Sequence, residues 1–168
     1  AGSSVAAAGD VDGDGFDDLL IGAPYYGDRN AGKAYLILGS SLGDEAAIDL
    51  SAADYHFVDT ADYTTAGPCC RRVGSSVSSA GDVDGDGFSD VLLGAPDDYD
   101  GGQKAGKAYL VFAASLVESA DVSPITVDMV LADYQFVGED EQDRAGSSVS
   151  TAGDVNGDDR DDLLVSAY

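Results

Sequence analysis

The stretch GDVDGDGFDD, from Gly9 to Asp18, places five carboxylates and three glycines within ten residues. It returns as GDVDGDGFSD at Gly81 and, in altered form, as GDVNGDDRDD at Gly153. Of the 32 acidic residues in the chain, 14 lie in these three stretches. Carboxylates this close repel one another or take up protons unless a positive charge lies among them. The recurrence of the stretch therefore bears on both the fold and the chemistry.

The acidic stretch belongs to a longer block that repeats with a period of 72 residues. AGSSVAAAGDVDGDGFDDLLIGAP at 1–24 matches VGSSVSSAGDVDGDGFSDVLLGAP at 73–96 and AGSSVSTAGDVNGDDRDDLLVSAY at 145–168. Two further pairs of blocks recur at offsets of 74 and 79 residues: AGKAYLILG with AGKAYLVFA, and ADYHFV with ADYQFV. Variable connections between constant blocks indicate one scaffold whose surface loops differ in length.

Each complete unit is predicted to contain four short β-strands. In the first unit, Ser3–Gly9 is small and tolerates a β-conformation, and Asp18–Pro24 is a continuous apolar run that suits a strand buried on both faces. Lys33–Gly39 is a second apolar strand, and Asp54–Val58 alternates and carries aromatic residues. Gly, Pro, Asn and Asp separate these segments, as expected for turns.

Repeated four-stranded antiparallel units are typical of the blades of a β-propeller. The fold class is therefore predicted to be all-β: a partial β-propeller with metal-binding hairpin loops. Two complete blades are expected at 1–72 and 73–144, and the first two strands of an incomplete third blade at 145–168. Because propellers usually have four or more blades, the chain is not expected to close a ring alone.

The first acidic loop alternates oxygen-bearing residues with small ones. Its candidate ligands, at loop positions 1, 3, 5, 7 and 9, are Asp10, Asp12, Asp14, the carbonyl of Phe16 and Asp18. Gly15 at position 6 permits a sharp turn. Converging oxygen ligands suit Ca²⁺, whereas Mg²⁺ prefers to keep water in an octahedral shell and Zn²⁺ prefers Cys or His. Calcium is the predicted metal.

An EF-hand loop is the obvious competitor for such a motif. It requires a glutamate at position 12 and a helix on each side. Position 12 here is Ile21, Leu93 or Val165, inside an apolar run. The sequence therefore predicts a calcium loop at the tip of a β-hairpin.

The third loop departs from the first two. Asn156 replaces Asp at position 3, and Asp159 replaces Gly at position 6. Asn supplies an oxygen without charge, and Asp adopts the left-handed conformation less easily than Gly. Asp159 and Asp161 are expected to face outward. The third site is predicted to bind more weakly, so two to three Ca²⁺ ions are expected.

Composition excludes several classes of function. The chain has 32 acidic and 8 basic residues, a formal charge of −24, which argues against binding nucleic acid or an anionic membrane. No apolar run approaches the roughly 20 residues that span a bilayer. The adjacent Cys69 and Cys70 leave three alternatives open: a strained ring, two free thiols, or links to other chains.

The blocks GSSV and GDVDGDGFDDLLIGAP together resemble the FG-GAP repeat of integrin α-subunit β-propellers and related bacterial surface proteins. Gly-Ala-Pro stands at 22–24 and 94–96, whereas Val73-Gly74 and Ala145-Gly146 replace Phe-Gly and Ser-Ala-Tyr ends the third unit. The resemblance implies calcium in all three loops. The ligands it implies for the second and third loops are Asp82, Asp84, Asp86, the Phe88 carbonyl and Asp90, and Asp154, Asn156, Asp158, the Arg160 carbonyl and Asp162.

The resemblance also implies an extracellular or cell-surface binding module for adhesion, stabilised by calcium. Its expected partner is a protein or glycan ligand, or further copies or blades of the same protein. Two alternatives stay open: a structural subunit of a surface layer or filament in which chains complete each other's blades, and the propeller part of a secreted polysaccharide- or lipid-acting enzyme. The single histidine, His56, lies in a predicted strand, and no nucleophile–base arrangement stands out, so no enzymatic activity is predicted.

Overall fold

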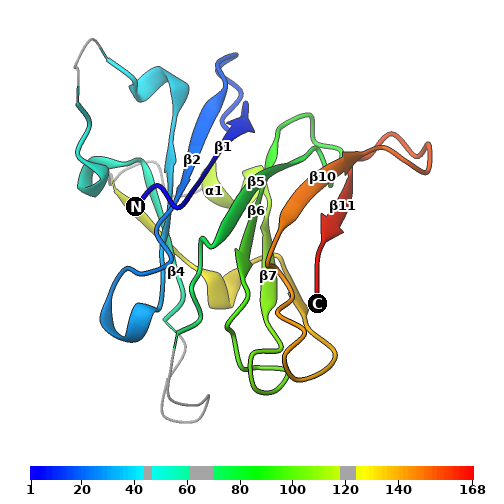
Figure 1. Cartoon of the computed structure of the whole chain (residues 1–168). Helices are drawn as coiled ribbons and strands as arrows, with labels where there is room; N and C mark the ends of the chain where they lie inside the picture. Colours follow the sequence, from blue (N-terminus) through cyan, green and yellow to red (C-terminus); the bar gives the residue numbers. More distant parts are fainter. Residues whose placement is uncertain (44–46, 61–69, 118–123) are drawn as a thin grey trace.

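The computed structural model describes residues 1–43, 47–60, 70–117 and 124–168. Three β-sheets stand side by side, and Figure 1 shows how they fan out along the chain. The strands are β1 (Ser4–Gly9), β2 (Asp18–Gly22), β3 (Ala34–Ile37), β4 (Tyr55–Val58), β5 (Ser76–Gly81), β6 (Asp90–Ala95), β7 (Lys107–Val111), β8 (Ile125–Asp128), β9 (Tyr134–Val137), β10 (Val149–Gly153) and β11 (Asp162–Val165). A five-residue helix, α1 (Ala113–Val117), follows β7.

Each sheet is built around one repeat unit. The first contains β1-β2-β3-β4, the second β5-β6-β7-β9, and the third is the hairpin β10-β11; all of these neighbours are antiparallel. The apolar runs form the inner strands, and β6 and β7 are buried along their whole length. The predicted all-β fold of propeller-type blades is confirmed.

The first sheet has a fifth strand that the sequence analysis did not predict. β8 lies in the connection between β7 and β9 of the second unit, yet it pairs in parallel with β4, with Tyr55 opposite Ile125. The Ile125 amide also donates to the carbonyl of Asp54 at 2.8 Å. The second unit therefore lends a strand to the outer edge of the first.

The main hydrophobic core lies between the first two sheets, as expected for blades that pack face to face. Its largest fully buried members are Leu20, Leu36, Phe57, Leu93, Tyr109, Leu116 and Met129. A smaller cluster joins the second sheet to the third hairpin and contains Ala80, Leu92, Ala108, Leu110 and Val149. Burial of this apolar surface is the main favourable contribution to holding the units together.

The glycine of Gly-Ala-Pro is required by the close approach of neighbouring units. A Cβ atom at Gly22 would lie 2.0 Å from the carbonyl oxygen of Gly74, and one at Gly94 would lie 2.0 Å from that of Gly146. At the first junction the hydroxyl of Ser4 donates to the same Gly74 carbonyl at 2.9 Å. The motif therefore marks where consecutive blades touch through their backbones.

A buried ionic cluster links the first two units near the start of β7. Arg71 lies 2.5 Å from a carboxylate oxygen of Asp59 and 3.3 Å from one of Asp98. The hydroxyl of Tyr109 donates to Asp59 at 2.7 Å. Since a buried charge is costly without partners, this cluster depends on both units being in place.

Candidate metal centres

Each acidic loop begins directly after a β-bulge. The pairing of β1 with β2 shifts register between Ala7 and Gly9, and the same shift precedes Gly81 and Gly153. These three glycines have left-handed φ values of 77°, 77° and 68°, which glycine adopts without steric cost. The three hairpin tips lie at the same end of the molecule, the upper side in Figure 1. The glycine before the first Asp of each loop is the sequence signal for the bulge.

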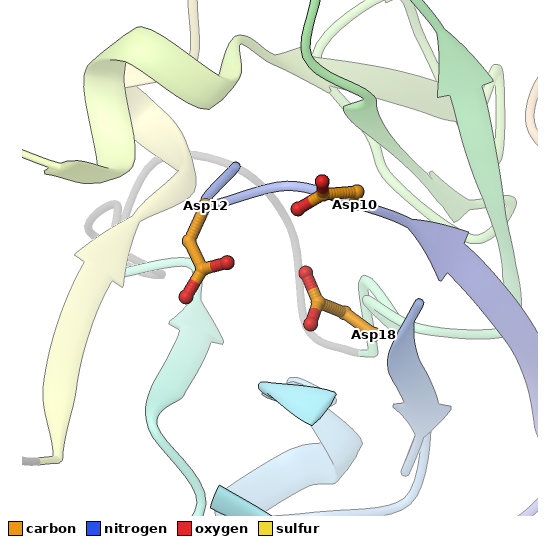
Figure 2. Close-up of side chains that lie close together, drawn as sticks. All are labelled: Asp10, Asp12 and Asp18. Atoms are coloured by element: carbon orange, nitrogen blue, oxygen red, sulfur yellow. The ribbon is translucent and has the colours of Figure 1, made fainter. Parts of the chain in front are cut away.

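Three carboxylates converge in the first loop. One oxygen from each residue lies within 4.8 Å of the other two, and Figure 2 shows the groups turned toward a shared space; they belong to Asp10, Asp12 and Asp18. The second loop repeats this group with Asp82, Asp84 and Asp90. Two loops 72 residues apart in sequence thus arrange acids at positions 1, 3 and 9 in the same way.

The carboxylate at position 1 is held by the backbone of its own loop. In the first loop the amides of Gly13 and Gly15 donate to the two oxygens of Asp10, at 2.7 and 3.0 Å. In the second loop the corresponding glycines hold Asp82 at 2.7 and 2.9 Å. These bonds fix the direction in which the position-1 carboxylate points.

The carboxylate at position 9 is buried. Asp18 is 2% exposed and Asp90 is fully buried. Asp18 accepts hydrogen bonds from the amides of Val11 at 2.8 Å and Gly39 at 2.7 Å. Burial raises the pKa of Asp90 to about 6, and it also raises the pKa of Asp18. A nearby cation favours the charged form of such an acid.

The structure does not bring position 5 into either group. A carboxylate oxygen of Asp14 accepts the amide of Phe16 at 2.8 Å, and one of Asp86 accepts the amide of Phe88 at 2.9 Å. These are local turns in which an Asp side chain bonds a backbone amide two residues later. Coordination by the position-5 carboxylates and by the two phenylalanine carbonyls stays a prediction.

The third loop keeps the backbone scaffold of the others but not the convergence of acids. Gly157 and Asp159 donate to the two oxygens of Asp154, at 2.6 and 2.9 Å. Asp159 has the left-handed φ of 65° expected at position 6. The side-chain amide of Asn156 donates to a carboxylate oxygen of Asp158 at 3.1 Å. Across the described part of the chain, three carboxylates come this close only in the first two loops.

Two residues of the third loop contact the second loop, and a third repeats a bond found in both earlier loops. Asp162 accepts the amide of Val155 at 2.9 Å, as its counterparts do in the earlier loops. The side chain of Arg160 lies over the second loop, 3.5 Å from where a Cβ of Gly85 would stand. Asp161 does not face outward as expected: it bonds the backbone of the second loop, because the two hairpins are packed side by side.

The donor set of the first two loops fits a hard divalent cation. Every converging group is a carboxylate, and no cysteine or histidine belongs to either group. Oxygen-only coordination in a flexible loop is the preference of Ca²⁺, and Mg²⁺ demands stricter geometry. The residues present therefore agree with the predicted calcium chemistry at positions 1, 3 and 9.

Fold and loops together define a class: a repeat protein of propeller-type blades, each of which carries an acidic hairpin loop. The model of the family described as "FG-GAP repeat" matches residues 1–37, 73–111 and 145–168. The chain belongs to the FG-GAP repeat family, as its resemblance predicted.

The chain is homologous to integrin alpha subunits over most of its length. It is 33% identical over 169 residues to integrin alpha-PS2 of Drosophila melanogaster, covering 96% of the chain and 11% of that protein. It is 30% identical over 175 residues to integrin alpha-5 of Xenopus laevis, covering 99% and 14% respectively. For human integrin alpha-7 the values are 29% over 164 residues, 98% and 12%. The chain thus spans less than a sixth of these relatives.

Proposed function

We propose that the chain is a calcium-binding part of an extracellular adhesion protein, in which Ca²⁺ has a structural role in each blade. The observation that carries the proposal is the convergence of three carboxylates at the same positions of two separate loops. Calcium would supply the positive charge that offsets their mutual repulsion. In the first loop Asp10, Asp12 and Asp18 would hold the ion, with Asp14 and the Phe16 carbonyl as further ligands.

The proposed partner is a protein or glycan ligand at the cell surface. Support comes from homology to integrin alpha subunits and from aromatic side chains in the loop between β2 and β3, where Tyr25 is 64% and Tyr26 50% exposed. Arg72, from the connection to the second unit, stacks over Tyr25 with 5.2 Å between guanidinium and ring centre.

No helix within the described ranges is long and apolar enough to cross a membrane.

The proposed role is non-catalytic, in keeping with relatives that are named as integrin subunits. His56 supports this, because it packs edge-on against Tyr35 with 5.1 Å between ring centres and is 7% exposed. Its Nε2 lies 3.0 Å from the carbonyl of Leu50. The histidine is thus engaged inside the first blade.

Calorimetric titration of the metal-free chain with Ca²⁺, and separately with Mg²⁺, tests the calcium proposal. The expected result is two tighter Ca²⁺ sites and a weaker third, with Mg²⁺ binding much less well. Asp12→Asn and Asp84→Asn should each weaken one of the two tighter sites, whereas the exposed Asp17→Asn should leave all sites unchanged. The absence of Ca²⁺ binding at millimolar concentration would refute the proposal.

Association with further blades or copies is proposed for the face of the second sheet on which the side chains of Tyr134 and Phe136 are exposed. Tyr134 is 56% and Phe136 37% exposed, whereas their counterparts Tyr55 and Phe57 in the first unit are 8% and 0% exposed. The second unit and its strand β8 cover the counterparts. Sedimentation analysis should detect self-association that Phe136→Ser reduces, and a strictly monomeric chain would contradict this role for copies of the chain.

A further inference from the structure

The second and third acidic loops are joined by a reciprocal pair of hydrogen bonds. The amide of Asp161 donates to the carbonyl of Asp82 at 2.9 Å. In return, a carboxylate oxygen of Asp161 accepts the amide of Asp82 at 2.9 Å. Asp82 is the position-1 residue of the second loop, so both of its backbone groups are held by a residue of the next unit.

The approach of this carboxylate depends on Gly81, which precedes Asp82. A Cβ atom at Gly81 would lie 1.9 Å from the carboxylate oxygen of Asp161, so any side chain there would displace it. The side chain of Asp82 is in turn fixed by the amides of Gly85 and Gly87. Asp82 is therefore held on both sides: its backbone by the third unit and its carboxylate by its own loop.

The junction between the first and second loops has half of this arrangement. Position 8 of the second loop is Ser89, and its amide donates to the carbonyl of Asp10 at 2.9 Å, as Asp161 does for Asp82. The Ser89 hydroxyl lies 2.2 Å from where a Cβ of Gly9 would stand. The Ser89 hydroxyl carries no charge. Within the described part of the chain it does not accept a hydrogen bond from the Asp10 amide, whereas Asp161 accepts one from the Asp82 amide. The two junctions thus differ by one carboxylate.

We propose that Asp161 is a positioning residue for the metal site of the second loop, supplied by the third unit. This inference rests on the proposed binding of calcium by that loop. Holding the backbone of Asp82 preorganises the first ligand, which lowers the ordering cost of binding. The second site therefore binds Ca²⁺ more tightly than the first, although their own ligand residues are the same.

An NMR titration of the ¹⁵N-labelled full chain with Ca²⁺ resolves the two sites. The amides of Gly15 and Gly87 report on the first and second loops, because each donates to the position-1 carboxylate. Asp161→Ser should weaken the second site roughly three- to tenfold, the size of one net hydrogen bond, and leave the first site unchanged. Asp161→Asn keeps an acceptor for the Asp82 amide and should recover part of the loss.

The reverse substitution tests the proposal without depending on the stability of the Asp161 variants. Ser89→Asp gives the first junction the carboxylate of the second and should tighten the first site by a similar factor. Asp17→Ser is the matched control: Asp17 occupies position 8 of the first loop and is exposed, so both affinities should stay the same. If Ser89→Asp does not tighten the first site and Asp161→Ser does not weaken the second, the proposal is overturned.

Hydrogen exchange in the presence of chelator separates this inference from the function on which it rests. Without metal, the Asp82 amide should exchange faster in Asp161→Ser than in the unsubstituted chain, and Asp161→Asn should restore protection. If the glycine amides never respond to Ca²⁺, the calcium function fails, and with it the metal role of Asp161. If they respond but neither affinity nor exchange depends on residue 161, only the present inference fails.

Discussion

At the scale of single residues, loop position 3 separates the first two loops from the third. Asp84 belongs to a group of three converging carboxylates, whereas Asn156 instead donates to Asp158. Because ligand charge tunes calcium affinity, we expect Asp84→Asn to weaken the second site about tenfold and Asn156→Asp to tighten the third. Site-resolved titration measures both. Equal affinities before and after substitution would show that charge at position 3 is not decisive.

His56 should give the protein a pH dependence that can be assigned to one residue, because it is the only histidine. Burial first, and then the ammonium of Lys33 at 3.3 Å, lower the pKa of His56 below its ordinary value of 6.5. The unfolded chain therefore binds this proton more readily, so stability is lost as pH falls below about 6.5. NMR titration in excess calcium gives the pKa, and unfolding at several pH values gives the slope.

His56→Gln is the matched variant for this effect. It removes the titrating group, so the slope of stability between pH 5.5 and about 7 should flatten in excess calcium, where the carboxylates of the loops are held by metal. A measured pKa of His56 at or above 6.5 would contradict the expected direction.

At the scale of elements, the junction glycines should be sensitive to a single methyl group. Gly94→Ala would place a Cβ 2.0 Å from the carbonyl of Gly146, a contact that only movement between the second and third units can relieve. We expect a loss of about 1–3 kcal/mol in unfolding free energy, the usual cost of overpacking. Gly43→Ala is the control, since nothing lies within 4 Å of its added methyl group. Denaturant unfolding compares the two variants.

The sequence predicted most strands and loops because the repeat places equivalent residues in register, so each motif supports the others. The apolar runs became β2 and β6, and the acidic stretches became hairpin tips. β8 was missed because its partner β4 belongs to the preceding unit, and four alternating residues give a weak signal without that partner. The contact of Asp161 with Asp82 was missed for a related reason: the two residues are 79 apart in sequence, and their contact depends on how two successive hairpins pack. Cys69, on which the adjacent-cysteine alternatives depend, lies outside the described residues.

At the scale of the whole molecule, calcium removal should destabilise the chain in steps. Each filled site stabilises the folded state by about 2.7 kcal/mol when free calcium is a hundredfold above its dissociation constant. The third loop, which lacks the converging group, should empty first as chelator is added. Thermal unfolding at graded free calcium, with NMR to identify the emptied loop, tests this order. A melting temperature that does not change with chelator would rule out a structural role for the metal.

The parallel pairing of β8 with β4 has a consequence for synthesis of the chain on the ribosome. About 70 residues separate the two strands, and translation at about 5–20 residues per second delays the arrival of β8 by roughly 4–14 s. During that interval the outer edge of β4 is open to strands of other nascent chains. The first blade is therefore completed only when most of the second repeat has been synthesised. The segment that folds into the first sheet thus extends beyond the segment that repeats in the sequence.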